Sequence, residues 1–350
     1  MLSSKKKIVL VSVGAIILGI LIFLGYSFVM SKNKVVDDNK EVPKKVEEKK
    51  EEEEQPDYSL FDLESDERSI AFMIDNHLDA RPQVGLQKAY MVYEVIVEGG
   101  MTRMMALFKD QNDVVVGPIR SSRHYFLDYA FDNDAVYVHF GFSPQASNDI
   151  IKFGVNNING ISSDGGLFWR DNSIAAPHNA FTNVNSVKNR LPNKKYRVTT
   201  DKGMLLNYSK EPLELNNDDS KVVNSVKVQY SKSYSVKYSY DSKNKVYNRY
   251  IGNLPHYDRV TKEQYTAKNI IVYNVKNYNI GDGTARQQLE TVGSGTGYYI
   301  SEGYAVPITW VKSSRSAKTI YKDTSGNPLT VNYGNTFIHI QPTYYKPIIE

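Results

Sequence analysis

Short apolar runs closed by polar residues dominate the chain from Ser69 onward and predict β-strands. SIAFMID (Ser69 to Asp75) is a continuous apolar run, and VYEVIVE (Val92 to Glu98) alternates with the two-residue period of a strand. MTRMMALF (Met101 to Phe108) and AVYVHFG (Ala135 to Gly141) continue the series. These runs predict a sheet in the first half of the outer region.

Segments whose apolar residues recur at helical intervals lie between some of these strand-like runs. SRHYFLDYAFDN (Ser122 to Asn133) places apolar residues at helical intervals, and SPQASNDIIKFG begins with Ser143 as an N-cap followed by Pro144. A further short helix is expected between Thr182 and Leu191. Strands separated by helices predict a layered α/β domain over residues 59–194.

The pattern changes after Pro192. Residues 195–220 are polar and are expected to be a linker, whereas residues 221–350 contain repeated strand patterns between Gly, Asn and Asp turns. VKVQYSKSYSVKYSYD (Val226 to Asp241) alternates over its length. A β-rich C-terminal domain is therefore expected after the α/β domain.

A long apolar run precedes these domains. Ile8 to Met30 contains no charged residue and is long enough for a helix that spans a bilayer. Lys5 to Lys7 precede it, so the positive-inside rule places the N-terminus in the cytoplasm and the bulk of the chain outside. A cleaved signal peptide is the alternative, but the run is longer than usual and no small-residue cleavage site follows. Residues 1–31 are thus expected to form a cytoplasmic tip and a single-pass anchor, and the charged residues 32–58 a disordered stalk.

The amino-acid composition excludes several kinds of functional site. The chain has no cysteine, which excludes disulfides, thiolate nucleophiles and a lipid-modified N-terminal cysteine. The net charge of +4 gives no argument for a nucleic-acid partner. The histidines show no HxH or HxxxH spacing, and Walker, G-x-S-x-G and zincin motifs are absent, so neither a metal nor a cofactor is expected.

The segment GPIRSSRHYF places Arg120 and Arg123 on either side of Ser121 and Ser122. Arginine presents a planar fork that matches phosphate or carboxylate, and an anion near a helix start also meets free backbone N–H groups. The segment therefore predicts an anion-binding site. The structural alternative is that Arg120 pairs with Glu94 or Glu98 and ties two strand ends together.

Other polar residues follow the predicted strands. Asp75 and Asn76 end the first strand, Glu98 ends another, and ligands of open α/β sheets bind at the carboxyl ends of strands. Arg103 follows a glycine pair that either makes a tight hairpin or lets the backbone approach a ligand. In the loop AAPHNAF, His178 precedes Asn179; its imidazole is a candidate acid, base or ligand, and a purely structural role is the alternative.

The motifs together resemble a known family. IDNHLDARPQVGLQKAYMVYEVIVEGGMTRMMALF, VGPIRSSRHYFLDYAFDNDAVYVHFG and PHNAFTN carry the resemblance in the first part, and LPHYDRVT, NIIVYNV and VGSGTGYYISEGYAVPITWVK carry it in the second. Across Ser69 to Pro342 the chain resembles the YerB-like family of bacterial lipoproteins, a two-part family of unknown function. The resemblance implies an extracytoplasmic location in a Gram-positive-type cell envelope. The chain departs from the lipoprotein pattern because it lacks the anchoring cysteine, so the apolar run would replace the lipid.

Three functions are compatible with these residues. In the first, an arginine cluster binds an anionic envelope ligand, either a phosphorylated glycan or a lipid; its contacts are Arg103, Arg120, Arg123, Asn76, Ser121, Ser122 and Asn179. In the second, an envelope phosphotransferase or glycan hydrolase uses Asp75 or Glu98 as base and His178 as acid, which requires these groups to lie within reach of one reacting atom. In the third, the tyrosine-rich β domain is an interaction scaffold for a wall-synthesis protein.

Overall fold

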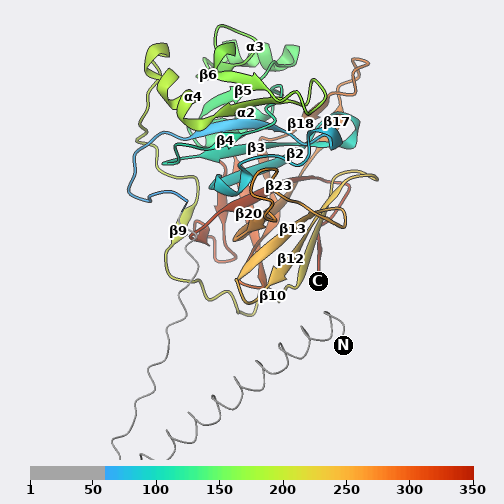
Figure 1. Cartoon of the computed structure of the whole chain (residues 1–350). Helices are drawn as coiled ribbons and strands as arrows, with labels where there is room; N and C mark the ends of the chain where they lie inside the picture. Colours follow the sequence, from blue (N-terminus) through green and yellow to red (C-terminus); the bar gives the residue numbers. More distant parts are fainter. Residues whose placement is uncertain (1–59) are drawn as a thin grey trace, which may run out of the picture. The chain divides into compact units, whose positions relative to one another are not determined.

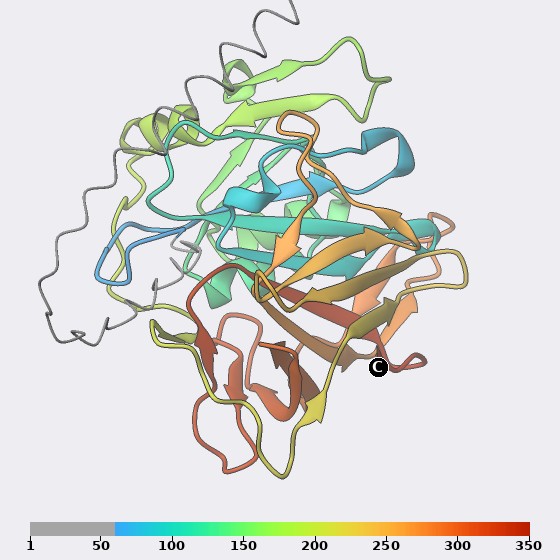
Figure 2. The same ribbon diagram turned by 60° about the horizontal axis from the view of Figure 1, so that its bottom comes forward.

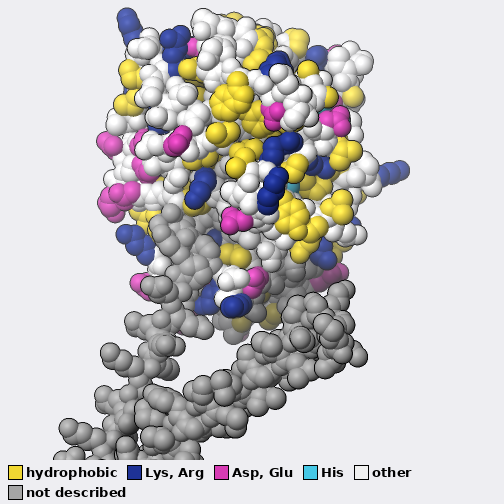
Figure 3. Space-filling model, viewed as in Figure 1, with side chains coloured by type: hydrophobic (Ala, Val, Ile, Leu, Met, Phe, Trp, Pro, Cys, Tyr) yellow, Lys and Arg dark blue, Asp and Glu magenta, His cyan; other side chains and the backbone are white. Residues whose placement is uncertain are grey.

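The computed structural model describes residues 60–350 (Figure 1). The predicted membrane span Ile8 to Met30 and the predicted stalk lie outside these residues. Within residues 60–350, no helix has the length and apolar character needed to cross a membrane. On the face shown in Figure 3, basic, acidic and hydrophobic side chains are interspersed, so bulk charge marks no binding face there.

A large mixed sheet runs through both halves of the sequence (Figure 1). Its order is β10-β20-β19-β16-β23-β2-β3-β1-β5-β6, with β21 paired to β20. The bounds are β10 Lys221–Val222, β20 Tyr304–Lys312, β19 Gly293–Ser301, β16 Asn269–Val275, β23 Thr336–Pro342, β2 Met91–Ile96, β3 Thr102–Phe108, β1 Ile70–Asp75, β5 Val136–His139, β6 Asn157–Asn159 and β21 Ile320–Lys322. The two halves predicted from sequence thus share one sheet.

The strand β23 joins the halves. It lies between β16 and β2 and is parallel to both, with Phe337 opposite Ile270 on one side and Val92 on the other. Every residue of β1, β2, β3 and β23 is buried. Strands covered on both faces have no solvent side, which explains why the first predicted strand is a continuous apolar run rather than an alternation.

Helices are few among the described residues, so the α/β expectation is met only in part and the fold is mostly β. The three predicted helices are confirmed as α2 (Phe126–Asp132), α3 (Pro144–Lys152) and α4 (Val184–Arg190). Ser143 caps α3, because its side chain accepts a hydrogen bond from the backbone N–H of Ala146. Figure 1 shows α3 and α4 at the end of the molecule that carries β5 and β6.

A second sheet is built only from the C-terminal half. Its order is β14-β13-β12-β11-β24, with β15 paired to β13. Its strands are β14 Leu254–Pro255, β13 Val246–Ile251, β12 Ser235–Asp241, β11 Ser225–Gln229, β24 Ile348–Ile349 and β15 Thr266–Ala267. The long alternating stretch Val226 to Asp241 is therefore two antiparallel strands rather than one. Figure 2 shows these yellow and orange strands in front of the cyan strands of the large sheet.

Smaller sheets complete the chain. Their strands are β4 Val115–Val116, β7 Phe168–Arg170 and β8 Ala180–Asn183 in one sheet, β9 Asn207–Ser209 and β22 Thr330–Asn332 in another, and β17 Asn277–Asn279 and β18 Gln287–Leu289 in a hairpin. The strand β9 lies inside the stretch 195–220 predicted as a linker, and its pairing with β22 ties that stretch to the C-terminal half.

A buried ion pair connects the two main sheets. Arg249 of β13 donates from Nη2 to Oε2 of Glu94 of β2 over 2.7 Å, and neither side chain is exposed to solvent. The other guanidinium donors reach the Tyr238 hydroxyl at 2.6 Å and Nδ1 of His256 at 3.0 Å. Burial raises the pKa of Glu94, but the Arg249 charge and the hydrogen bond from Thr102 lower it, and the pKa lies below its ordinary value. Glu94 is therefore ionised at neutral pH.

We expect Arg249→Met to lower the free energy of unfolding by about 3–5 kcal/mol, because it leaves the Glu94 carboxylate buried without a counter-ion. Urea unfolding at neutral pH measures this difference. The matched control is Lys276→Met, which removes an exposed ion pair to Glu290 and should leave the unfolding midpoint unchanged. Equal effects in the two variants would contradict the importance of the buried pair.

Candidate functional site

A cavity of about 300 Å³ opens where β1 and β2 end and β3 begins. We call it the arginine cavity. Its lining consists of Asp75, His77, Val97, Glu98, Met101, Thr102, Arg103, Arg120, Arg123, His178, Thr284 and Arg286. Six of the residues selected from the sequence therefore share one cavity, and two further lining residues come from the C-terminal half.

Asp75 organises one wall of the arginine cavity. Its Oδ2 atom lies 2.7 Å from Nδ1 of His178 and 3.2 Å from Nε of Arg120. The contact with Arg120 is an ion pair without the alignment of a hydrogen bond, since Nε of Arg120 has no hydrogen-bond partner. The other oxygen, Oδ1, accepts the backbone N–H of His77 at 3.0 Å. Because Nδ1 of His178 is held by Asp75, the ring nitrogen left for a ligand or a proton is Nε2.

The Asp75 carboxyl is ionised at neutral pH. Burial raises its pKa, but the charges of Arg103 and Arg120, the His77 backbone N–H and the His178 hydrogen bond lower it, and the pKa lies below its ordinary value. Only 3% of this residue is exposed, so these partners are poorly screened by water. A stable carboxylate at this position fixes the tautomer and the orientation of the imidazole.

Arg103 is the most deeply placed cation of the cavity. It lies directly across from Asp75 in the antiparallel pairing of β1 with β3, which puts both side chains on the same face. Its Nη1 atom donates to the backbone oxygen of Ser121 at 2.5 Å, whereas its Nε atom is buried without a hydrogen-bond partner. Burial and the nearby charge of Arg123 lower the pKa of Arg103 to about 10. The guanidinium therefore stays charged at neutral pH and is only partly satisfied.

Arg123 forms the opposite wall with Glu98. Its Nε atom donates to Oε1 of Glu98 at 2.5 Å, and its Nη1 atom donates to Oγ of Ser121 at 3.1 Å. Burial raises the pKa of Glu98, but the hydrogen bond and the charge of Arg123 bring it below its ordinary value. The alternative that Arg120 pairs with Glu94 or Glu98 is wrong, because Glu94 pairs with Arg249 and Glu98 pairs with Arg123.

The charges of the arginine cavity do not cancel. Arg120 is paired with Asp75 and Arg123 with Glu98, which leaves Arg103 as the guanidinium without a carboxylate of its own. The fourth arginine, Arg286, is bonded to Asp282 at 3.1 Å and brings its own counter-ion. Four arginines and two carboxylates line the cavity, so one positive charge is in excess once Asp282 is counted, even with both histidines neutral.

Four residues predicted to contact a ligand are not among those that line the arginine cavity: Asn76, Ser121, Ser122 and Asn179. Asn76 is fully buried, and its Nδ2 atom donates to the Thr102 hydroxyl at 2.7 Å and to the Tyr234 hydroxyl at 2.6 Å. Ser122 is also fully buried, and Asn179 is only 4% exposed. The side chains of Asn76, Ser122 and Asn179 are hydrogen-bonded within the protein.

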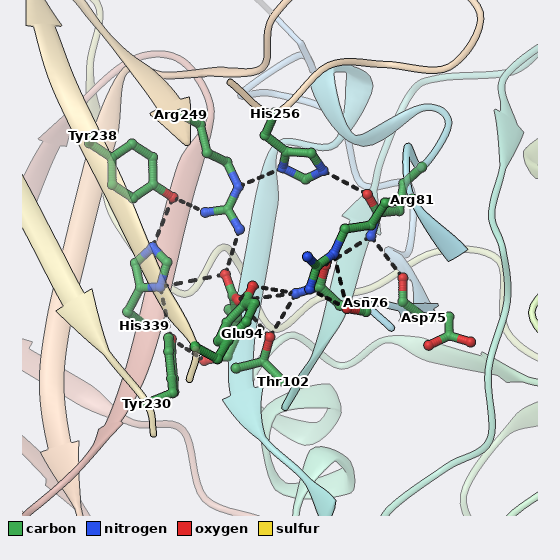
Figure 4. Close-up of polar contacts among 12 residues, drawn as sticks. Asp75, Asn76, Arg81, Glu94, Thr102, Tyr230, Tyr238, Arg249, His256 and His339 are labelled. Atoms are coloured by element: carbon green, nitrogen blue, oxygen red, sulfur yellow. Dashed lines mark hydrogen bonds and ion pairs between the residues drawn. The ribbon is translucent and has the colours of Figure 1, made fainter. Parts of the chain in front are cut away.

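Figure 4 shows how Asn76 connects the site to the core. Gln83 donates from Nε2 to the backbone oxygen of Asp75 and to Oδ1 of Asn76, both at 2.9 Å. Oε1 of the same Gln83 lies 2.6 Å from Nε2 of His256, whose Nδ1 atom accepts from Arg249. A chain of hydrogen bonds therefore runs from the buried ion pair to the backbone of Asp75.

His77 adds a group that sequence spacing did not indicate. Its ring stacks on that of His178 with centroids 4.4 Å apart, and His77, Asp79 and His178 bring three metal-ligating atoms within 4.8 Å of one another. The residues come from distant parts of the chain, so no short motif could show them together. His77 and Asp79 are exposed and Nδ1 of His178 is held by Asp75, and we assign no metal to this group.

Thr284 and Arg286 were not selected as site residues in the sequence analysis, for a different reason. They lie in the segment GDGTARQ, whose glycines are typical of a turn. The segment connects β17 and β18, which pair as an antiparallel hairpin. Nothing local reveals that this hairpin reaches the first half of the chain, since that depends on the packing of the whole fold.

Comparison with known proteins gives a consistent result. Residues 60–197 match the family model described as "Protein of unknown function (DUF3048) N-terminal domain", and residues 226–338 match its C-terminal counterpart. The chain is 31% identical over 284 residues to "Putative lipoprotein YerB" of Bacillus subtilis (strain 168), covering 79% of this chain and 82% of that protein. The crystal structure of the YerB protein from Bacillus subtilis has a TM-score of 0.71 and 29% identity, covering 81% of this chain and 94% of that one.

We expect Asp75→Asn to be less stable than the wild type at pH 7, because the substitution leaves Arg103 and His178 facing a neutral amide. The pKa of Asp75 is depressed in the folded state, so its stabilising contribution is present above the ordinary value of 3.8 and is lost as the pH falls below it. The stability difference between the two proteins should therefore shrink between pH 5 and pH 2. Urea unfolding across this range measures it, and a difference that stays constant would contradict the assignment.

Proposed function

The chain belongs to the DUF3048 family of proteins of unknown function, and on this premise we propose that it is a membrane-anchored envelope protein that binds an anionic ligand in the arginine cavity. The ligand class is a phosphorylated glycan or a phosphorylated lipid. The observation that carries the proposal is Arg103, a buried guanidinium whose Nε atom has no hydrogen-bond partner and which lacks a carboxylate of its own.

The location rests on two observations. The relative of Bacillus subtilis carries the name "Putative lipoprotein YerB", and the present chain has an apolar run from Ile8 to Met30 but no cysteine to carry a lipid. We propose that this run anchors the protein in the membrane as a single helix, with Lys5 to Lys7 on the cytoplasmic side. The described residues would then lie outside the membrane, where phosphorylated envelope polymers and lipids occur.

The geometry supports phosphate as the recognised group. Arg103 and Arg120 both line the cavity, and the Nε atom of each is buried without a hydrogen-bond partner. A phosphate oxygen accepts several N–H groups at once, and charge-assisted hydrogen bonds of this kind are the strong ones. The free energy lost by leaving these buried donors unsatisfied is recovered when an anion binds.

The Asp75–His178 contact supports a second candidate, catalysis of phosphoryl transfer or glycan hydrolysis. A carboxylate at 2.7 Å from Nδ1 holds the imidazole with Nε2 directed away from Asp75, which is how a carboxylate prepares a histidine to act as a base. In this arrangement Asp75 orients and His178 transfers the proton, whereas the sequence assigned the base to Asp75. Glu98 lines the same cavity but is held by Arg123.

We expect the full-length protein to bind inorganic phosphate, and Arg103→Met to weaken this binding at least about tenfold, because it removes the charge and the unsatisfied donor. Arg103→Lys keeps the positive charge but not the planar guanidinium group, so it should recover only part of the affinity for phosphate. Isothermal titration calorimetry at low ionic strength measures the dissociation constants.

Arg190→Met serves as the matched control, because Arg190 is paired with Asp164 and does not line the cavity. Its affinity for phosphate should equal that of the wild type. Circular dichroism and urea unfolding establish that each variant folds. Unchanged phosphate binding in folded Arg103→Met would remove the proposal.

The catalytic candidate predicts hydrolysis of bis-p-nitrophenyl phosphate, with a rate that falls at least about a hundredfold in His178→Gln while phosphate affinity changes little. A loss of this size follows from the removal of the proton-transferring group, and release of p-nitrophenol measures it. No turnover by the wild type between pH 5 and pH 9 would reject catalysis on this substrate class and leave the binding function.

A further inference from the structure

A second cavity adjoins the first. Its volume is about 550 Å³, and we call it the acidic cavity. Its lining includes His124, Asp128, Asp149, Gln288, Glu290 and Arg315. Ten of its twelve lining residues carry a polar or charged group, Tyr125 included.

The same two segments line both cavities. Arg123 lines the arginine cavity, and the next residue, His124, lines the acidic cavity. On the β17–β18 hairpin, Arg286 lines the first and Gln288 the second. A hydrogen bond of 2.8 Å between His124 and Gln288 joins these segments. The two cavities are therefore neighbours along these two segments.

The charge of the acidic cavity is opposite to that of the arginine cavity. Its carboxylates are Asp128, Asp149 and Glu290. Arg315 is bonded to Asp128 at 2.8 Å and to Asp149 at 2.6 Å, and Lys276 outside the lining is bonded to Glu290 at 2.7 Å, which leaves one negative charge in excess. A second phosphate would meet like charge here. Hydroxyl groups, in contrast, donate to carboxylate oxygens and are accepted without a charge penalty.

One wall of the acidic cavity offers unused polar atoms. Gln145 lies on α3, and its Oε1 atom is buried without a hydrogen-bond partner. The neighbouring Asn148 is exposed on the same helix and also lines the cavity. A buried acceptor without a donor costs free energy, which a hydroxyl group of a ligand would recover.

We propose that the ligand is a phosphorylated glycan whose phosphate occupies the arginine cavity and whose sugar rings occupy the acidic cavity. The inference rests on the proposed anion-binding function and selects one of its two ligand classes. An acyl chain would desolvate the carboxylates of Asp149 and Glu290 without replacing their hydrogen bonds to water. A sugar ring carries hydroxyl groups around its edge and suits a cavity lined by carboxylate and amide groups.

The test compares three probes on the full-length protein by isothermal titration calorimetry: inorganic phosphate, maltose 1-phosphate, and dihexanoyl phosphatidic acid below its micellar concentration. We expect maltose 1-phosphate to bind about tenfold more tightly than phosphate, because hydrogen bonds in the acidic cavity add to those of the phosphate. The short-chain lipid should bind no more tightly than phosphate.

The double variant Gln145→Ala/Asn148→Ala should bind maltose 1-phosphate little more tightly than phosphate, while its affinity for phosphate stays unchanged. Asn189→Ala is the matched control, since Asn189 is an exposed asparagine on α4 that lines neither cavity. Tighter binding of the lipid, or a disaccharide gain that survives in the double variant, would overturn the glycan assignment while phosphate binding stands. No binding of any probe would overturn the proposed function and this inference with it.

Discussion

The ion pair between Glu94 and Arg249 is the interaction on which the arrangement of the fold depends. It joins the large sheet to the second sheet in a place that water does not reach, and both partners have their remaining hydrogen-bonding groups occupied. Burial and the charge of Arg249 lower the pKa of the neighbouring His339 to about 3, so this histidine stays neutral and accepts or donates hydrogen bonds without adding charge. A buried pair stabilises a fold only when every member of its network is satisfied, and this network meets that condition.

The network also explains why the arginine cavity keeps its shape. Thr102 donates to Glu94 in the core and lines the cavity on its other side. Asn76 and Gln83 extend the same hydrogen bonds to the backbone of Asp75 (Figure 4). A site for a small anion needs donors held in place before the ligand arrives, because ordering them on binding would cost affinity. The residues that contact Asp75 belong to the first half, and the second half supports them indirectly, because His256 bonds Gln83 and Tyr234 bonds Asn76.

Much of the local structure could be predicted from sequence, because local signals determine it. The cap at Ser143 and the apolar run of β1 are set by neighbours in the chain. The grouping of Asp75, Arg120 and His178 was expected in part, since strand ends of one sheet converge. Which of these residues pair with one another could not be predicted, because an ion pair depends on distances between segments that are far apart in the sequence. The entry of Arg286 into the cavity and the burial of Asn76 follow from tertiary packing, and neither has a local signature.

The place of β23 has a consequence for how the chain is made. This strand lies more than 200 residues after β2 in the sequence, yet β2 and β16 both pair with it. A nascent chain that has only its first half therefore lacks the strand between β2 and β16. The two halves can share a sheet only after β23 has been synthesised, and strand pairings so distant in sequence form slowly.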